Sequence, residues 1–368
     1  MIGDEGAKPI ELVPKIQSVR PAAEAVEDAD EWSKALVAKM VRDGVHPVLV
    51  FGTGGSGKTT LLQSLIAYAQ GDDDAGFAPS LGESVFPDGY PGKSERDENA
   101  RSFFDNAVAA FRSHRLAPRT QLSQGPFFVP INIAVAGETL RFAFLESMGE
   151  WYEREHDADP RRRALAPYQN IRWEIAAILR TFGRPMSVVF VAPSIPIAGQ
   201  SVEYSHECMA NAMNQYERLR QGAKKADNAL LLATKWDGLH NPDDPKSGFS
   251  DATVARALLT IEKWVVWPRF CGIGGMRPGA RSLTPYAAAH INPDGSMVIG
   301  GLYADVFDGF NRTVWNWLYG NAREDIVSGA RPVLYPDVVP PPPKWKWYEA
   351  AVRWLLRRGG EDEPRRRP

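Results

Sequence analysis

The stretch from Val48 to Ala69 contains glycines, a lysine and threonines at a spacing that suits phosphate chemistry. Its letters, VLVFGTGGSGKTTLLQSLIAYA, run from an apolar segment through a glycine-dense turn into a helix-like apolar pattern. Two nucleotide motifs overlap on this turn: G-x-G-x-x-G, a dinucleotide fingerprint, and G-x-x-x-x-G-K-[ST], a phosphate loop. They imply different chemistry, so the neighbouring segments must decide between them.

The phosphate loop agrees better with the segment that follows. A dinucleotide site needs a second strand that ends in an acidic residue about 20 positions on. Asp72 has that spacing, but residues 59–71 have the pattern of a helix and a turn. In a phosphate loop, glycine backbones let N–H groups converge on phosphate oxygens, a lysine reaches the β- and γ-phosphates, and a threonine hydroxyl binds Mg²⁺. The residues predicted to bind phosphate are Gly52, Thr53, Gly54, Gly55, Ser56, Gly57, Lys58, Thr59 and Thr60.

A second group of residues suits recognition of a purine base. Thr234, Lys235 and Asp237 directly follow the apolar run ALLLAT. A carboxylate at Asp237 can accept hydrogen bonds from guanine N1–H and the 2-amino group, and adenine offers neither donor. The stem of Lys235 can cover the purine face. The sequence thus favours guanine, although T-K-x-D alone is equally typical of a capped turn.

Alternating strand and helix patterns indicate the scaffold for both groups. Apolar runs predict strands, and residues 127–147 predict a hairpin that turns at residues 136–138. We therefore expect an α/β protein with the P-loop NTPase fold, in which a mainly parallel central sheet has helices on both faces and one antiparallel hairpin strand. Residues 71–96 are rich in turn formers and are expected to be a long surface excursion.

The order of these segments resembles that of P-loop GTPases of the translation-factor-related and Ras-like class, over residues 46–320. The resemblance implies that Thr120 is the first switch and contacts Mg²⁺ and the γ-phosphate. It implies that Gly149 is the second switch, reading the γ-phosphate through its N–H, and that Glu146 stands where the family has a magnesium-binding Asp. Phosphate-loop and x-x-x-G-Glu variants of this sort also resemble the prokaryotic double-GTPase group.

Departures from the family pattern bear on catalysis. Glu150 stands where a Ras-like protein has Gln, and a carboxylate cannot donate a hydrogen bond as an amide does, so unaided hydrolysis is expected to be slow. Arg119 is a candidate arginine finger in cis; the alternative is a solvated loop residue. The backbone N–H of Ala288 is the candidate for the family's last guanine contact, and a core strand residue is the equal alternative.

Three regions are expected along the chain. Residues 1–45 form an N-terminal extension with one helix, residues 46–320 form the GTPase-like domain with an insertion at about 71–119, and residues 321–368 form a Pro-rich spacer and a basic amphipathic helix. That helix, at 344–358, is expected to dock on a membrane surface or a partner, or to pack on its own domain. An effector or activator protein is the expected partner, and the oligomeric state stays open.

Composition excludes several classes. The chain has 368 residues, with 43 Lys and Arg against 45 Asp and Glu, so a global basic field for nucleic acid is absent and no specific nucleic acid is expected. Cys208 and Cys271 are its two cysteines and make no disulfide framework. The N-terminus lacks a signal-peptide pattern, and no apolar run reaches the ~18–20 residues of a membrane span. A cytoplasmic location is expected.

The favoured function is a guanine-nucleotide switch that binds GTP and GDP with Mg²⁺ and hydrolyses GTP. Lys58, Thr120, Gly149, Glu150 and Arg119 are the candidate catalytic residues, and Thr59, Thr120 and Glu146 the candidate magnesium ligands. One alternative is an ATP-using P-loop enzyme, either an ATPase or a kinase. Another is a scaffold that binds nucleotide without turnover.

Overall fold

The computed structural model describes most of the chain between Ala23 and Ile326. The described residues are 23–71, 78–113, 126–135, 138–147, 173–197, 201–221, 227–239, 264, 266–274, 276–291, 297–298 and 304–326. Arg119, Thr120, Gly149, Glu150 and the tail segment 344–358 lie outside them.

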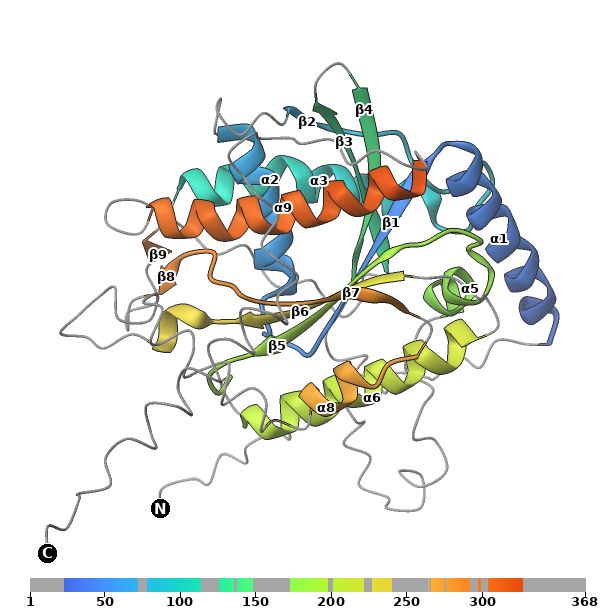
Figure 1. Ribbon diagram of the computed structural model, residues 1–368. Coiled ribbons are helices and arrows are strands. Elements are labelled where there is room, and N and C mark those ends of the chain that lie inside the picture. Colours follow the sequence, from blue (N-terminus) through green and yellow to red (C-terminus); the bar gives the residue numbers. More distant parts are fainter. Residues whose placement is uncertain are drawn as a thin grey trace, which may run out of the picture.

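Strands and helices alternate along most of the chain (Figure 1). The strands are β1 (Val45–Gly52), β2 (Ala78–Leu81), β3 (Phe127–Val135), β4 (Glu138–Glu146), β5 (Ser187–Pro193), β6 (Asp227–Thr234), β7 (Met276–Pro285), β8 (His290–Ile291) and β9 (Met297–Val298). The helices are α1 (Ala23–Arg42), α2 (Lys58–Gly71), α3 (Lys93–Arg112), α5 (Trp173–Thr181), α6 (Val202–Arg220), α8 (Val266–Cys271) and α9 (Ala304–Ile326).

A seven-stranded sheet in the order β2-β3-β4-β1-β5-β6-β7 forms the centre of the molecule. Strand β3 pairs antiparallel with both β2 and β4, whereas the pairs β4–β1, β1–β5, β5–β6 and β6–β7 are parallel. Within this sheet β3 therefore runs opposite to the other strands. The expected α/β class, with a mainly parallel sheet and one antiparallel hairpin strand, is confirmed and is consistent with a P-loop NTPase fold.

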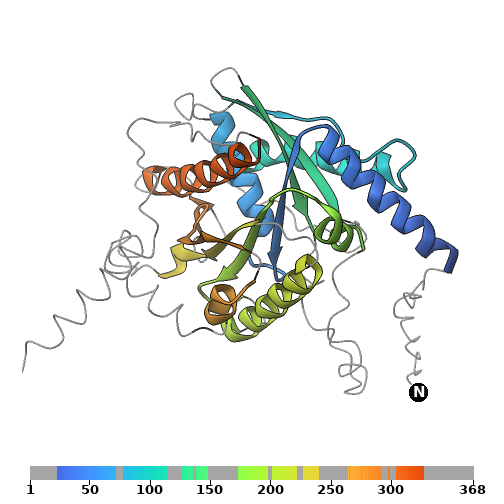
Figure 2. The same cartoon turned by 45° about the vertical axis from the view of Figure 1, so that its right-hand side comes forward.

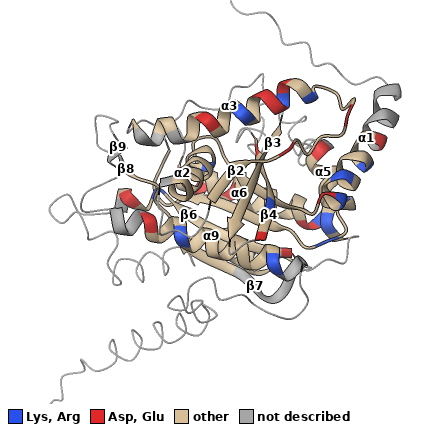
Figure 3. Cartoon of the chain, turned by 90° about the horizontal axis from the view of Figure 1, so that it is seen from above, with Lys and Arg blue, Asp and Glu red and all other residues tan. Residues whose placement is uncertain are grey.

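Helices cover both faces of the sheet, as Figures 1 and 2 show. Helices α2, α3 and α9 lie on one face, and α1, α5, α6 and α8 lie on the other. Every residue of β1, β5 and β6 is buried, which is the pattern of parallel strands that are covered twice. Charged residues of both signs lie on peripheral helices such as α1 and α3, and the strands carry few (Figure 3).

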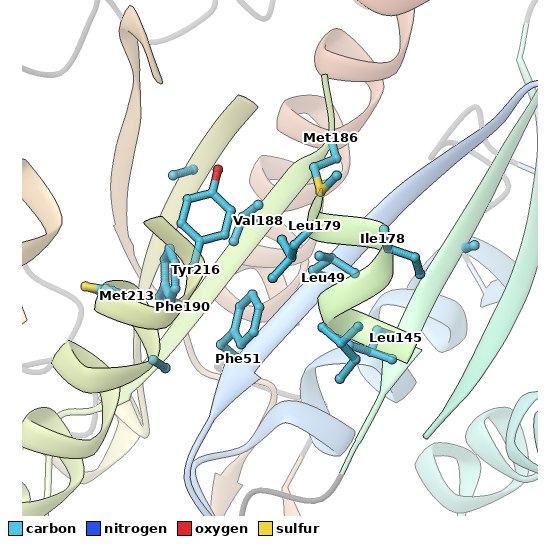
Figure 4. Packing of buried hydrophobic residues seen from close by; sticks show 14 of the residues in the cluster. Leu49, Phe51, Leu145, Ile178, Leu179, Met186, Val188, Phe190, Met213 and Tyr216 are labelled. Atoms are coloured by element: carbon cyan, nitrogen blue, oxygen red, sulfur yellow. The ribbon is translucent and has the colours of Figure 1, made fainter. Parts of the chain in front are cut away.

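Alternate residues of a strand enter different cores, because successive side chains point to opposite faces. Leu49 and Phe51 of β1 enter the core under α1, α5 and α6, whereas Val48 and Val50 enter the core under α2, α3 and α9. Figure 4 shows the first core, where Phe51 stacks on Phe190 with ring centroids 5.4 Å apart. These cores fix β1, and with it the turn that β1 leads into.

The expected surface excursion at 71–96 is wrong for its described part. Strand β2 extends the sheet beside β3, and Val85, Phe86 and Tyr90 are buried in the core under α1. The guanidinium of Arg96 lies over the rings of Phe86 and Tyr90. Turn-forming residues dominate the local pattern, but a few aromatic residues at the right places suffice to bury this segment against distant elements.

Two expected boundaries also differ. The helix of the N-terminal extension, α1, places Leu36, Val37 and Met40 in the same core as β1, so its described part is continuous with the domain. At the other end α9 runs to Ile326, past the expected boundary at residue 320. Among the described helices, none combines the length and apolar character that crossing a bilayer requires.

His46 is buried where β1 begins. Its side chain is 2% exposed, and its Nε2 lies 2.9 Å from Ser187 Oγ, which also accepts a hydrogen bond from Asn321 Nδ2 at 3.1 Å. Burial lowers the pKa of His46 from 6.5 to about 3, because the charged imidazolium loses its solvation.

This shift predicts a pH dependence of stability. Between pH 6.5 and about 3 the unfolded state binds a proton at His46 that the folded state does not, so the free energy of unfolding should fall as the pH falls through this window. Denaturant titrations of wild type and His46→Gln at several pH values measure the difference. The variant should show the flatter profile, and identical profiles would contradict the prediction.

Candidate functional site

The turn between β1 and α2 has the conformation that its glycines predict. Gly55 and Gly57 have φ angles of 70° and 101°, in the left-handed region that favours glycine. At Gly52 an added Cβ would lie 2.5 Å from Ser56 Oγ and 3.1 Å from Val191 Cβ. The turn thus folds back over the end of β1, and the glycine at its start is required by close approach rather than by φ.

Lys58, the first residue of α2, directs its ammonium group back into this turn. Its Nζ donates to the carbonyl oxygens of Gly52 at 2.8 Å and Thr53 at 3.0 Å, and the residue is 6% exposed. A buried ammonium must be compensated by acceptors, and anionic oxygens at the mouth of the turn would be better acceptors than carbonyls. The partial positive charge at the N-terminus of α2 also favours a bound anion.

Two buried hydroxyls of the turn also suit a polar ligand. Thr53 Oγ1 and Ser56 Oγ have no hydrogen-bond partner among the described residues, and both residues are fully buried. Buried polar atoms are usually paired, so unpaired ones at this place call for a partner. Oxygen atoms of a bound phosphate, or water beside it, would supply one.

The second residue of α2 contacts the end of β4. Thr59 Oγ1 donates to Glu146 Oε1 at 2.6 Å, and Glu146 is only 2% exposed. A hydroxyl and a carboxylate are the oxygen ligands that Mg²⁺ prefers, so this pair fits a magnesium site. Among the described residues no group of three His, Cys, Asp or Glu is placed to hold a metal. A metal here would therefore rely on the Thr59 hydroxyl and the Glu146 carboxylate, with further oxygens from a ligand or water.

The predicted base-binding residues lie beside the turn. Thr234, at the end of β6, donates from Oγ1 to the carbonyl oxygen of Ser56 at 2.7 Å. Lys235 has a φ of 57°, a conformation that is costly for a residue with a Cβ and that clusters at functional sites. Asp237 follows in the short 3-10 helix Trp236–Leu239 and is 9% exposed. The structure therefore brings the two predicted groups together.

Ala288 lies outside the strands, so the alternative that it is a core strand residue is wrong. Strand β7 ends at Pro285, and Ala288 lies in the bend before β8 with its side chain in the core under α2. Strand β8 contacts the 3-10 helix that carries Asp237. The strand prediction is corrected, and the segment stays close to the predicted base site.

These elements meet at one edge of the sheet. Strands β1, β4 and β6 run parallel within the sheet, so Gly52, Glu146 and Thr234 all lie at carboxyl ends. Open α/β sheets bind their ligands outside this edge. Thr59 and Glu146, two of the candidate magnesium ligands, are brought into direct contact here. The hydrogen bond between Thr234 and Ser56 was not expected, because it joins residues 178 positions apart in the chain.

Comparisons with known proteins add little to this geometry. No family model matches the chain, and no curated protein matches it in sequence. One solved structure with some similarity is the signal recognition particle receptor SRb-GTP/SRX complex from Chaetomium thermophilum. It has a TM-score of 0.32 and 13% identity, and the match covers 67% of this chain and 93% of that one. A similarity this low assigns no function to this chain.

Gly57 offers a direct test of the turn conformation. At a φ of 101° an alanine is strained even though no atom lies within 3.9 Å of an added Cβ. Gly57→Ala should lower the free energy of unfolding by about 1–3 kcal/mol. Gly183→Ala is the matched control, since nothing lies within 4 Å there and no left-handed φ is required; it should change stability by less than about 0.5 kcal/mol. Equal effects in denaturant titrations would exclude a strained turn.

Proposed function

We propose that this protein is a guanine-nucleotide switch that binds GTP and GDP with Mg²⁺ and slowly hydrolyses GTP. One observation carries the proposal: the Thr234 hydroxyl donates to the Ser56 carbonyl at 2.7 Å. This bond ties the T-K-x-D turn to the glycine turn, so that a base and a phosphate chain of one ligand can be bound together. Either motif alone would be weaker support.

The glycine turn suits the phosphate end of the ligand. Backbone N–H groups of this turn would converge on phosphate oxygens, as in other glycine-rich turns that precede a helix. The N–H of Ser56 is an exception, because it donates to the carbonyl oxygen of Thr53 at 3.2 Å. The Lys58 ammonium, now on two carbonyl oxygens, would move to the β- and γ-phosphates. Thr53 Oγ1 and Ser56 Oγ lie in the same turn and support a polar ligand.

Asp237 and Lys235 suit the base end. The carboxylate of Asp237 would accept from guanine N1–H and the 2-amino group, and it would lose both bonds with adenine. The Lys235 stem would cover one face of the base. The buried Trp236 between them fixes the turn in the protein. An ATP-using enzyme is the rival function, and the carboxylate at Asp237 is the observation that argues against it.

Thr59 and Glu146 are the described residues that would hold Mg²⁺, together with Thr120 from the first predicted switch. When bound, Mg²⁺ supplies positive charge against the phosphate oxygens. Gly149 would read the γ-phosphate through its N–H, Glu150 would accept a hydrogen bond from the attacking water, and Arg119 would contact developing charge. These four switch roles rest on the resemblance, which extends to the double-GTPase group.

A switch acts through other proteins, so we propose an effector or activator as partner and the cytoplasm as its location. The basic segment 344–358 is the proposed docking element, on a membrane surface or a partner. These assignments rest on sequence, and comparing proteins captured by the GTP-loaded and the GDP-loaded chain would test them.

Guanine recognition predicts a change of base preference in Asp237→Asn. The amide replaces one acceptor by a donor, which should weaken GTP binding by about 1–3 kcal/mol and favour xanthosine triphosphate, whose 2-oxo group needs a donor. Titrations of GTP, xanthosine triphosphate and ATP against both proteins measure this. The guanine assignment would be refuted if the ratio of the affinities for GTP and xanthosine triphosphate were the same in the variant and in wild type. It would also be refuted if wild type bound ATP more tightly than GTP.

Magnesium binding predicts a difference between two Thr59 variants. Thr59→Ala removes the hydroxyl that contacts Glu146, so GTP affinity should become nearly insensitive to a chelator. Thr59→Ser keeps the hydroxyl and should retain the magnesium dependence of wild type. The measurement is GTP affinity with Mg²⁺ and with chelator. Full magnesium dependence in Thr59→Ala would place the metal elsewhere.

Turnover distinguishes a switch from a scaffold. Because Glu150 lacks an amide donor, single-turnover hydrolysis should be slow, on the order of 10⁻⁴–10⁻² s⁻¹. Glu150→Gln should change this rate several-fold while GTP affinity stays constant, since the contact belongs to the transition state. No phosphate release above background would support the scaffold, and a wild-type rate above about 1 s⁻¹ would show that other residues catalyse.

A further inference from the structure

Tyr286, directly after β7, holds the predicted base turn through its backbone. Its N–H donates to the carbonyl oxygen of Ala233 at 2.9 Å, and its carbonyl oxygen accepts from the N–H of Trp236 at 3.3 Å. These two bonds lie on either side of Thr234 and Lys235. The path of the chain into Asp237 therefore depends on where Tyr286 stands.

The side chain of Tyr286 is fixed from the other direction. Its hydroxyl hydrogen-bonds with Ser64 Oγ of α2 and donates to Asn311 Oδ1 of α9 at 2.7 Å. Tyr286 is 2% exposed and Ser64 is 1% exposed, so water does not compete for these bonds. Burial raises the pKa of the Tyr286 hydroxyl, which stays protonated and able to donate.

Tyr286 thus connects the base turn with the helix that begins at Lys58 and Thr59. Ser64 lies six residues after Lys58, which is about 9 Å along an α-helix. The bond from Thr234 to Ser56 joins the same two parts at the glycine turn. These two hydrogen bonds contact different points of the base turn. Together they restrict both translation and rotation of the turn relative to α2, whereas a single bond would leave rotation free.

We propose that Tyr286 is a positioning residue for base specificity: its buried hydroxyl sets where Asp237 stands relative to the phosphate turn. The inference rests on the proposed function. A carboxylate that must accept two hydrogen bonds from one base edge tolerates little displacement. A small displacement of Asp237 would therefore reduce the preference for guanine over other bases before it abolished nucleotide binding. Tyr286 does not need to touch the nucleotide to act in this way.

The ratio of the affinities for GDP and inosine diphosphate reports the placement of Asp237. Inosine lacks the 2-amino group, so the ratio measures the second hydrogen bond, and diphosphates avoid hydrolysis during titration. Tyr286→Phe removes the hydroxyl and keeps the ring. Tyr68→Phe is the matched control, because Tyr68 also links α2 to α9: its hydroxyl, four residues after Ser64, accepts from Arg312 Nε at 3.1 Å.

We expect Tyr286→Phe to lower the ratio about two- to ten-fold, the range that one misplaced hydrogen bond costs. Tyr68→Phe should keep the wild-type ratio even if it lowers stability. Ser64→Ala removes the partner hydroxyl on α2 while Tyr286 stays in place, so it should lower the ratio as well. If Tyr286→Phe does not fold, the ratio measured for Ser64→Ala tests the inference in its place.

Two results would overturn the inference: an unchanged ratio in the folded variants of Tyr286 and Ser64, or an equal fall in Tyr68→Phe, which would indicate general loosening of α2. A third outcome is that wild type binds neither GDP nor inosine diphosphate. It would refute the proposed function and, with it, the basis of this inference.

Discussion

The hydrogen bond from Thr234 Oγ1 to the carbonyl oxygen of Ser56 is the contact on which the candidate site depends. It joins the end of β6 to the glycine turn after β1, although β5 lies between these strands. Both residues are buried, so the bond is protected from water. Without it the two predicted groups would be separate turns at one sheet edge, with no fixed spacing for a single ligand.

The sheet makes this bond possible. Because β1, β5 and β6 are parallel and buried on both faces, their carboxyl ends are held at one level by two packed cores. The same alignment brings β4 beside β1, so that Glu146 reaches Thr59. The packed apolar cores thus fix the positions of the few polar residues that form the candidate site.

Polar ties between α2 and its surroundings complete the arrangement. Trp315 Nε1 donates to the carbonyl oxygen of Leu65 at 2.9 Å, and the Tyr286 hydroxyl hydrogen-bonds with the neighbouring Ser64 Oγ. Both contacts are buried among apolar side chains, where an unmade hydrogen bond is costly. Helix α2 is consequently fixed at its middle as well as at the end that carries Lys58 and Thr59.

Local sequence was enough to predict the strand, glycine turn and helix around Lys58 and the alternation of strands and helices. These follow from backbone preferences and periodicities of neighbouring residues, which act locally. It also indicated T-K-x-D as a base site, though not that Lys235 would adopt a left-handed backbone. The folded chain was needed to reveal the burial of Phe86 and Tyr90, the direct hydrogen bond from Thr59 to Glu146, and the contact of Tyr286 with Ser64. The last two contacts span 87 and 222 positions, so they exist only once strand order and register bring distant residues to the same place.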